Sequence, residues 1–171
     1  MRARFVRWAP PLPAEERVAL RRQEAAEAAV MVMRQASQRW PPVLASALDA
    51  GFLDLEVADL RWRVRETLLR HVGVGGRAYI GSTSDPGWRW GGGRFIRSSG
   101  EWAFMPGHRL GGWRLMSVLG AWPDRRCAEL EPMAIEEGEA FLDDGLANVA
   151  RDARGLEIRA FPGYSFIYVC V

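Results

Sequence analysis

The sequence changes its pattern near residue 66, and this change limits the folds that the chain can adopt. The stretch 13–40 is rich in Ala, Glu, Arg and Met and begins with acidic residues, which predicts one long helix. Pro41 and Pro42 end that helix. From Thr67 onward, short apolar runs alternate with glycine-rich turns, which is typical of strands. We therefore expect an α+β protein rather than a doubly wound sheet.

Several further elements are expected along the chain. A second helical segment, interrupted near Gly51, is predicted between residues 43 and 64. The glycine-, tryptophan- and arginine-rich stretch 88–112 predicts a long irregular loop, a type of segment that is usually functional or mobile. The remaining predictions are a hairpin formed by 67–72 and 77–83, a strand at 113–122, a helix at 127–146 and a terminal strand at 164–171.

Length and composition exclude several classes of protein. The chain has 171 residues, of which 49% are hydrophobic, so it is long enough for one globular domain with a substantial core. It has no continuous apolar run of the length needed to span a membrane and no secretory-type start, so we expect a soluble intracellular protein. The two cysteines, Cys127 and Cys170, lack metal-binding spacing and are expected in the core.

Charge is distributed unevenly along the chain. All 23 basic residues are arginine, and the net charge is only +2. Residues 61–126 nevertheless contain twelve arginines against four acidic residues, whereas residues 127–171 contain three against nine. The middle third is thus a candidate surface for a polyanion. The acidic segment after it is either solvated or able to bind a metal ion.

Glu131 is set apart from its acidic neighbours by its position on the predicted helix. At 100° per residue it falls on the same arc as the apolar residues, whereas the other glutamates projected, Glu129, Glu136 and Glu139, fall outside that arc. A carboxylate on a core-facing arc is costly unless an arginine or a metal cation meets it. Both partners remain open at this stage, and Pro132 leaves the start of the helix uncertain.

The stretch Arg77–Gly93, "RAYIGSTSDPGWRWGGG", resembles part of a known family when it is taken together with the next 55 residues of the chain, up to Asn148. The strand with YIG, the T-x-D-P turn, an arginine after it, the strand "WRLMSVLGAW", the helix "AELEPMAI" and Asn148 occur in the order of the GIY-YIG endonucleases. The resemblance covers residues 67–150. It implies a small three-stranded antiparallel sheet flanked by helices, in a domain at 63–171 after a helical N-terminal extension at 1–62.

The resemblance also implies an activity, namely metal-dependent hydrolysis of phosphodiester bonds in DNA. In that family a tyrosine removes a proton from water, an arginine stabilises the phosphate, and a helix glutamate holds one divalent ion. The matching residues are Tyr79, Arg89 and Glu131, with Mg²⁺ or Mn²⁺ as the expected ion. Asn148 is expected to order the site or to contact phosphate. Without the resemblance, a tyrosine at the position of Tyr79 is more often a core aromatic than a catalytic one, and the alternative for Arg89 is a cation stacked between Trp88 and Trp90.

One family feature is missing from the sequence. The GIY triplet should precede YIG by about ten residues, near Thr67, but no tyrosine lies between Phe52 and Tyr79. His71, on the proposed first strand, is a candidate replacement because an unperturbed imidazole can accept a proton near neutral pH. His108 is a second candidate for proton transfer or phosphate binding.

Nucleic acid is the expected partner, either DNA or RNA. The candidate contacts are arginines near the YIG strand and in the 88–112 stretch, with tryptophans that either stack on unpaired bases or pack the sheet: Arg77, Arg94, Arg97 and Arg109, with Trp88, Trp90 and Trp102. The alternatives are a nucleic-acid-binding module that has lost cleavage and a structural protein whose aromatics bury an interface.

Overall fold

A computed structural model describes residues 13–45, 56–72, 76–96, 99–148 and 164–171 of the chain. The helices are α1 (Ala14–Arg39), α2 (Val57–His71), α3 (Pro86–Gly91) and α4 (Asp124–Leu142), with the 3-10 turns η2 (His108–Gly111) and η3 (Asp143–Gly145). The strands are β1 (Val43–Ala45), β2 (Tyr79–Thr83), β3 (Gly92–Ile96), β4 (Trp102–Pro106), β5 (Met116–Pro123) and β6 (Tyr164–Cys170). The expected α+β class is confirmed.

The central sheet has four strands in the order β1-β5-β6-β2, and β3 and β4 form a separate hairpin. β6 runs antiparallel to both of its neighbours, whereas β1 runs parallel to β5. The expected three-stranded antiparallel sheet therefore needs correction. The fourth strand, β1, lies where the helical segment 43–64 was predicted to begin, and that part of the prediction is wrong. Three residues are too few to show an alternating pattern.

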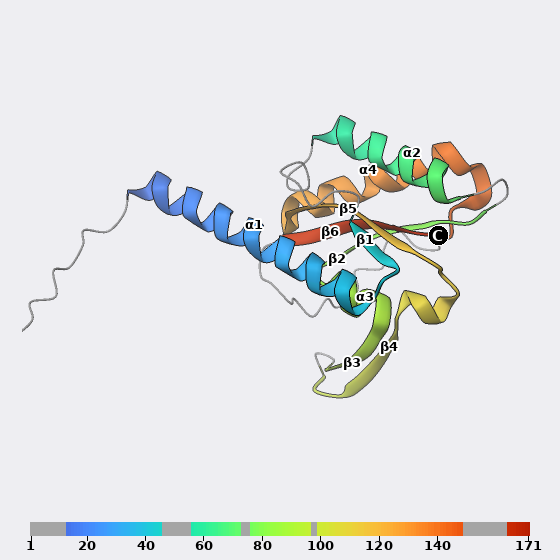
Figure 1. Ribbon diagram of the computed structural model, residues 1–171, viewed down its shortest axis with the longest axis horizontal. Helices are drawn as coiled ribbons and strands as arrows, with labels where there is room; N and C mark the ends of the chain where they lie inside the picture. Colours follow the sequence, from blue (N-terminus) through green and yellow to red (C-terminus); the bar gives the residue numbers. More distant parts are fainter. Residues whose placement is uncertain (1–12, 46–55, 73–75, 97–98, 149–163) are drawn as a thin grey trace, which may run out of the picture.

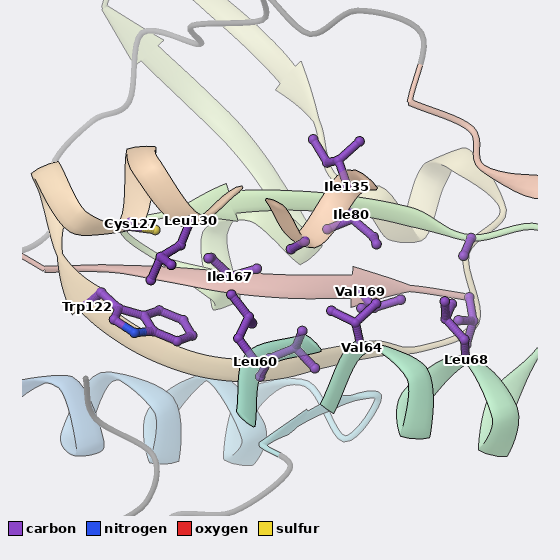
Figure 2. Packing of buried hydrophobic residues seen from close by; sticks show 14 residues of the cluster. Leu60, Val64, Leu68, Ile80, Trp122, Cys127, Leu130, Ile135, Ile167 and Val169 are labelled. Carbon is purple, nitrogen blue, oxygen red and sulfur yellow. The ribbon is translucent and has the colours of Figure 1, made fainter. Parts of the chain in front are cut away.

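One face of the sheet is covered by α2 and α4 (Figure 1). Figure 2 shows the apolar core between these helices and the sheet, where Ile167 and Val169 of β6 point toward the helices. The helices contribute a buried stripe to this core: Leu60, Val64 and Leu68 from α2, and Cys127, Leu130, Ala134 and Ile135 from α4.

The opposite face of the sheet is covered by the second half of α1 and by α3. Because side chains alternate along a strand, Phe166, Tyr168 and Cys170 of β6 point to this face. Their partners in the second core come from both helices: Ala29, Val32, Met33 and Ala36 of α1, and Trp90 of α3. The first half of α1 projects beyond the sheet (Figure 1).

The expected hairpin between residues 67 and 83 does not form. Residues 67–71 are instead the last turn of α2, so the predicted first strand is wrong. Leu68 lies four residues after Val64, which lies four after Leu60, and this spacing places all three on one buried helix face. The helical periodicity continued through a run of leucines that had suggested a strand.

The proposed boundary at residue 62 lies inside α2, and β1, from the supposed N-terminal extension, pairs with β5 of the central sheet. The stretch 88–112 was expected to be irregular. In its described residues it instead contains the end of α3, the β3–β4 hairpin and η2.

The long N-terminal helix, the strand β5, the helix α4 and the terminal strand β6 are confirmed. α4 begins at Asp124, well before Pro132, so the helical projection of Cys127 and Glu131 was in the correct phase. Both cysteines are buried and unbridged. None of the helices in the described residues is long and apolar enough to cross a membrane.

Candidate active site

The turn after β2 places Arg89 on a short helix. Asp85 caps α3, because its side-chain Oδ1 accepts a hydrogen bond from the Trp88 amide at 2.9 Å. Pro86 occupies the first helical position, where its missing N–H costs nothing. The Thr83 hydroxyl accepts a hydrogen bond from the Asp85 amide at 3.2 Å. The T-x-D-P sequence therefore fixes the direction of α3 and of the arginine on it.

Two tyrosines from adjacent strands meet on the α1 and α3 face of the sheet. Gly81 of β2 lies opposite Tyr168 of β6, and the ring centroids of Tyr79 and Tyr168 are 6.1 Å apart. A Cβ atom at Gly81 would lie 3.0 Å from the Tyr168 hydroxyl and 3.1 Å from the Tyr79 hydroxyl. The two hydroxyls thus converge over the one residue of the YIG strand that has no side chain.

This crowding predicts the effect of adding a methyl group at Gly81. In Gly81→Ala the new Cβ would lie 2.8 Å from Tyr79 Cε1, which is closer than non-bonded carbons tolerate. We expect a loss of about 1–3 kcal/mol in unfolding free energy, measured by urea titration. Gly111→Ala is the control, because its Cβ would meet nothing closer than 3.4 Å. Equal losses in the two variants would contradict the proposed crowding.

Arg89 extends into this cluster as an uncompensated cation. Its Nε donates a hydrogen bond to the Tyr168 hydroxyl at 3.2 Å, and Nη1 donates to Met105 Sδ at 3.1 Å. Burial lowers the pKa of Arg89, but the Tyr168 and Tyr79 hydroxyls raise it more, and the net change is upward. The guanidinium is therefore charged at neutral pH. Among the residues that the structure describes, no carboxylate pairs with it.

His108 completes the cluster from the 3-10 turn η2. Its ring lies 5.0 Å from that of Tyr79, and its Nε2 lies 2.8 Å from the Tyr168 hydroxyl. Burial, reinforced by the charge of Arg89, lowers the pKa of His108 to about 3, so the imidazole is neutral. Burial also raises the pKa of Tyr168 well above its usual value, although Arg89 opposes this change. Tyr168 therefore keeps its proton, which we assign to the hydrogen bond with His108 Nε2.

Glu131 lies at the outer edge of β2, the strand that carries Tyr79 and Gly81. Its Oε1 accepts a hydrogen bond from the Ser82 amide at 3.0 Å, and its Oε2 accepts one from the Ser82 hydroxyl at 2.8 Å. Its partner among the described residues is thus Ser82, the residue next to Gly81, rather than an arginine. Glu131 reaches this edge from α4, which covers the sheet face opposite to the cluster of Tyr79, Tyr168 and Arg89. The helical projection did not single out Glu137, which is buried and pairs with Arg61 and Arg65 of α2.

Asn148 also binds the edge strand β2. Its Oδ1 accepts a hydrogen bond from the Ile80 amide at 3.0 Å, and its Nδ2 donates to the Ile80 carbonyl. The backbone of Ala78 is paired with Gly145 and Ala147 in the same way. Because an unpaired edge invites another strand, these contacts and Glu131 cover the outer edge of β2. The amide of Asn148 thus holds the backbone of β2, and its two expected roles, ordering the site or contacting phosphate, stay predictions.

The other predicted site residues lie in different places. His71 is in the last turn of α2, which covers the opposite sheet face from Tyr79, so its placement on a strand beside Tyr79 was wrong. Arg77 and Arg94 are not buried, and Arg97 lies outside the described residues. Arg109 is exposed, with Nε donating to the Gly91 carbonyl at 3.2 Å and its guanidinium 4.8 Å from the Trp40 ring centroid.

Sequence reasoning missed Tyr168 as a site residue. The family pattern predicts a second tyrosine upstream of Tyr79, whereas the second tyrosine in the structure, Tyr168, comes from β6 near the end of the sequence. A polar-tipped residue in the centre of the apolar run "SFIYVCV" was the available signal, but nothing in the spacing linked it to the YIG strand.

The described residues contain no group of three or more His, Cys, Asp or Glu side chains arranged to hold a metal ion. Glu131 is thus a single carboxylate.

No protein-family model, no curated protein and no solved structure matches this chain.

Proposed function

We propose that this protein is a metal-dependent endonuclease that hydrolyses phosphodiester bonds in DNA on a GIY-YIG-like core. The observation that carries the proposal is the environment of Arg89. A partly buried guanidinium without a carboxylate partner is costly unless an anion joins it, and such groups are typical of binding sites for anions. Phosphate suits the planar donors of arginine, and the excess of arginines in residues 61–126 favours a polyanion.

Tyr168 supports the family resemblance by an unexpected route. The residues Phe166-Ile167-Tyr168 of β6 lie beside the YIG strand, with Tyr168 opposite Gly81. We infer that Tyr168 takes the place of the tyrosine that the sequence lacks before Tyr79. On this view the partner strand is the last of the chain instead of the one before YIG.

Arg89, Tyr79 and Tyr168 then each have a role in hydrolysis. Water attacks phosphorus, the bond from phosphorus to the leaving oxygen breaks, and overall the proton that the water gives up ends on the leaving oxygen. Arg89 binds the non-bridging oxygens, where negative charge develops. Tyr79 is only half-buried, so we assign it contact with the attacking water. Tyr168 is fully buried and positions Arg89 and His108.

Glu131 fits one kind of metal site. Its two oxygens accept bonds from Ser82, but a carboxylate has about four lone-pair positions, so coordination remains open to it. Mg²⁺ is commonly held by one or two carboxylates together with water and substrate phosphate, which a single glutamate allows. When bound, the ion would stabilise negative charge on the phosphate and leaving oxygens.

The test is nicking of supercoiled plasmid DNA with Mg²⁺ or Mn²⁺. We expect metal-dependent nicking by the wild-type protein and a loss of about 100-fold or more in Glu131→Gln, which keeps a group able to bond Ser82 but removes the charge. Glu136→Gln is the matched control, because Glu136 is exposed on the same helix. We expect it to cleave like the wild type.

The result also separates the alternatives. Nicking that persists in Glu131→Gln would rule out the assigned role of this carboxylate. Salt-sensitive DNA binding without nicking by the wild type would identify a binding module that has lost cleavage. Neither binding nor nicking would leave the structural protein as the remaining alternative.

A further inference from the structure

The β3–β4 hairpin presents an exposed aromatic face. Trp102 and Phe104 of β4 are 68% and 60% exposed, and they alternate with the less exposed Ala103 and Met105. Arg94 of β3 pairs with Phe104 across the hairpin, so it shares that face, and it is also exposed. Exposed large aromatics on one face of a strand are unusual unless they bind something.

This hairpin projects from the body of the protein beside α3 (Figure 1). At its base Gly92 and Gly107 meet backbone to backbone, since a Cβ on either would lie 2.3 Å from the amide nitrogen of the other. Its less exposed face contacts the candidate active site, because Met105 Sδ accepts the hydrogen bond from Arg89. The hairpin is therefore held against the cluster around Arg89 by its Met105 side, and its aromatic face points away from that cluster.

The charge around the hairpin indicates what it binds. Between Pro86 and Arg114 the chain contains five arginines and a single acidic residue, Glu101, and Arg94 is the arginine that the described residues place on the aromatic face. Aromatic side chains combined with arginines on one surface are the arrangement by which proteins stack unpaired bases and neutralise their phosphates. A duplex, whose bases are already stacked, offers the two rings nothing comparable.

We propose that the β3–β4 hairpin is a substrate-binding arm that stacks unpaired bases of a nucleic acid on Trp102 and Phe104, with Arg94 on the adjacent phosphate. This inference rests on the proposed function for its biological sense, but the binding itself is independent of cleavage. The preferred substrate is then single-stranded or contains unpaired bases.

Binding is measured by fluorescence anisotropy in EDTA, so that no cleavage occurs, with a labelled single-stranded DNA of about 20 nucleotides and its duplex as probes. Trp102→Ala should weaken single-strand binding about 5- to 100-fold and duplex binding much less. Trp102→Phe should restore most of the affinity, because it keeps an aromatic face. Arg94→Gln should lower the slope of log affinity against log salt by about one.

Trp62→Ala is the matched control, since Trp62 is 59% exposed on α2, which covers the other side of the sheet. It should bind like the wild type. Because Trp102 is exposed, its removal should leave the urea midpoint unchanged, which excludes unfolding as the cause. The arm is overturned if the wild type does not bind the single strand, or if Trp102→Ala binds as the wild type or no worse than Trp62→Ala. Concentration-dependent dimerisation that Trp102→Ala abolishes would also overturn it, in favour of a protein interface.

The two proposals fail in distinguishable ways. If the wild type nicks DNA and Trp102→Ala binds the single strand as well as the wild type, the proposed substrate-binding arm is refuted and the proposed nuclease stands. If the wild type never nicks DNA and Trp102→Ala loses single-strand binding, the proposed nuclease is refuted and the proposed substrate-binding arm stands.

Discussion

Arg89→Ala is expected to reduce the rate of metal-dependent nicking by about 1,000-fold or more. Arginines that neutralise charge on a transferring phosphoryl group contribute about 10³- to 10⁵-fold in well-studied cases. In this protein Arg89 is the cation that the two tyrosine hydroxyls surround, and no described carboxylate competes for it. The measurement is the single-turnover nicking rate under saturating protein.

Stability provides the second part of this test. A structural arginine would destabilise the fold strongly when removed, whereas Arg89 is half-buried and donates hydrogen bonds to the Tyr168 hydroxyl and to Met105 Sδ without a carboxylate partner among the described residues, so its removal should lower the unfolding free energy only slightly. We therefore expect Arg89→Ala to be inactive and at least nearly as stable as the wild type in urea. Arg125→Ala serves as the control for the loss of an arginine, because Arg125 is exposed on α4 and pairs with Glu129, and it should retain the single-turnover rate. Full activity in Arg89→Ala would contradict the role in phosphate binding that the proposed nuclease assigns to Arg89.

His108 is expected to make the protein unstable to mild acid. The pKa of His108 in the fold is about 3, against 6.5 for an ordinary histidine, so the unfolded chain takes up this proton first as the pH falls. Stability from His108 is thus fully present above pH 6.5 and is lost as the pH falls toward 3. The loss amounts to at most about 1.4 kcal/mol per pH unit.

His108→Gln is the variant that isolates this effect, because glutamine can bond Tyr168 but does not titrate. Between about pH 7 and pH 4.5 the wild type should lose about 2–3 kcal/mol more unfolding free energy than the variant, as measured by urea titration at each pH. His71, the other histidine, is present in both proteins, so its contribution cancels. If the two proteins respond equally to pH, His108 is not held neutral by Arg89 and burial.

Local patterns predicted the elements whose evidence lies within one stretch of sequence. α1, α4, β5 and β6 each have a periodicity or composition that can be read in a single window. The turn before α3 followed from Thr83, Asp85 and Pro86 in the same way. The failures occurred where a short apolar run fits two structures, as at Thr67 and Leu68, or where a strand has only three residues, as in β1.

The sequence by itself determined that this is an α+β chain with a basic middle third and a YIG strand followed by an arginine. It also marked Glu131 as an acid on an otherwise apolar helix face, because helical phase is a local property. Only the tertiary structure decided which side chains meet. Tyr168 lies 89 residues after Tyr79, and their neighbourhood comes from the pairing of β2 with β6, which no local pattern encodes. Arg89 and His108 reach the Tyr168 hydroxyl because burial, rather than their place in the chain, fixes α3 and η2 beside the sheet.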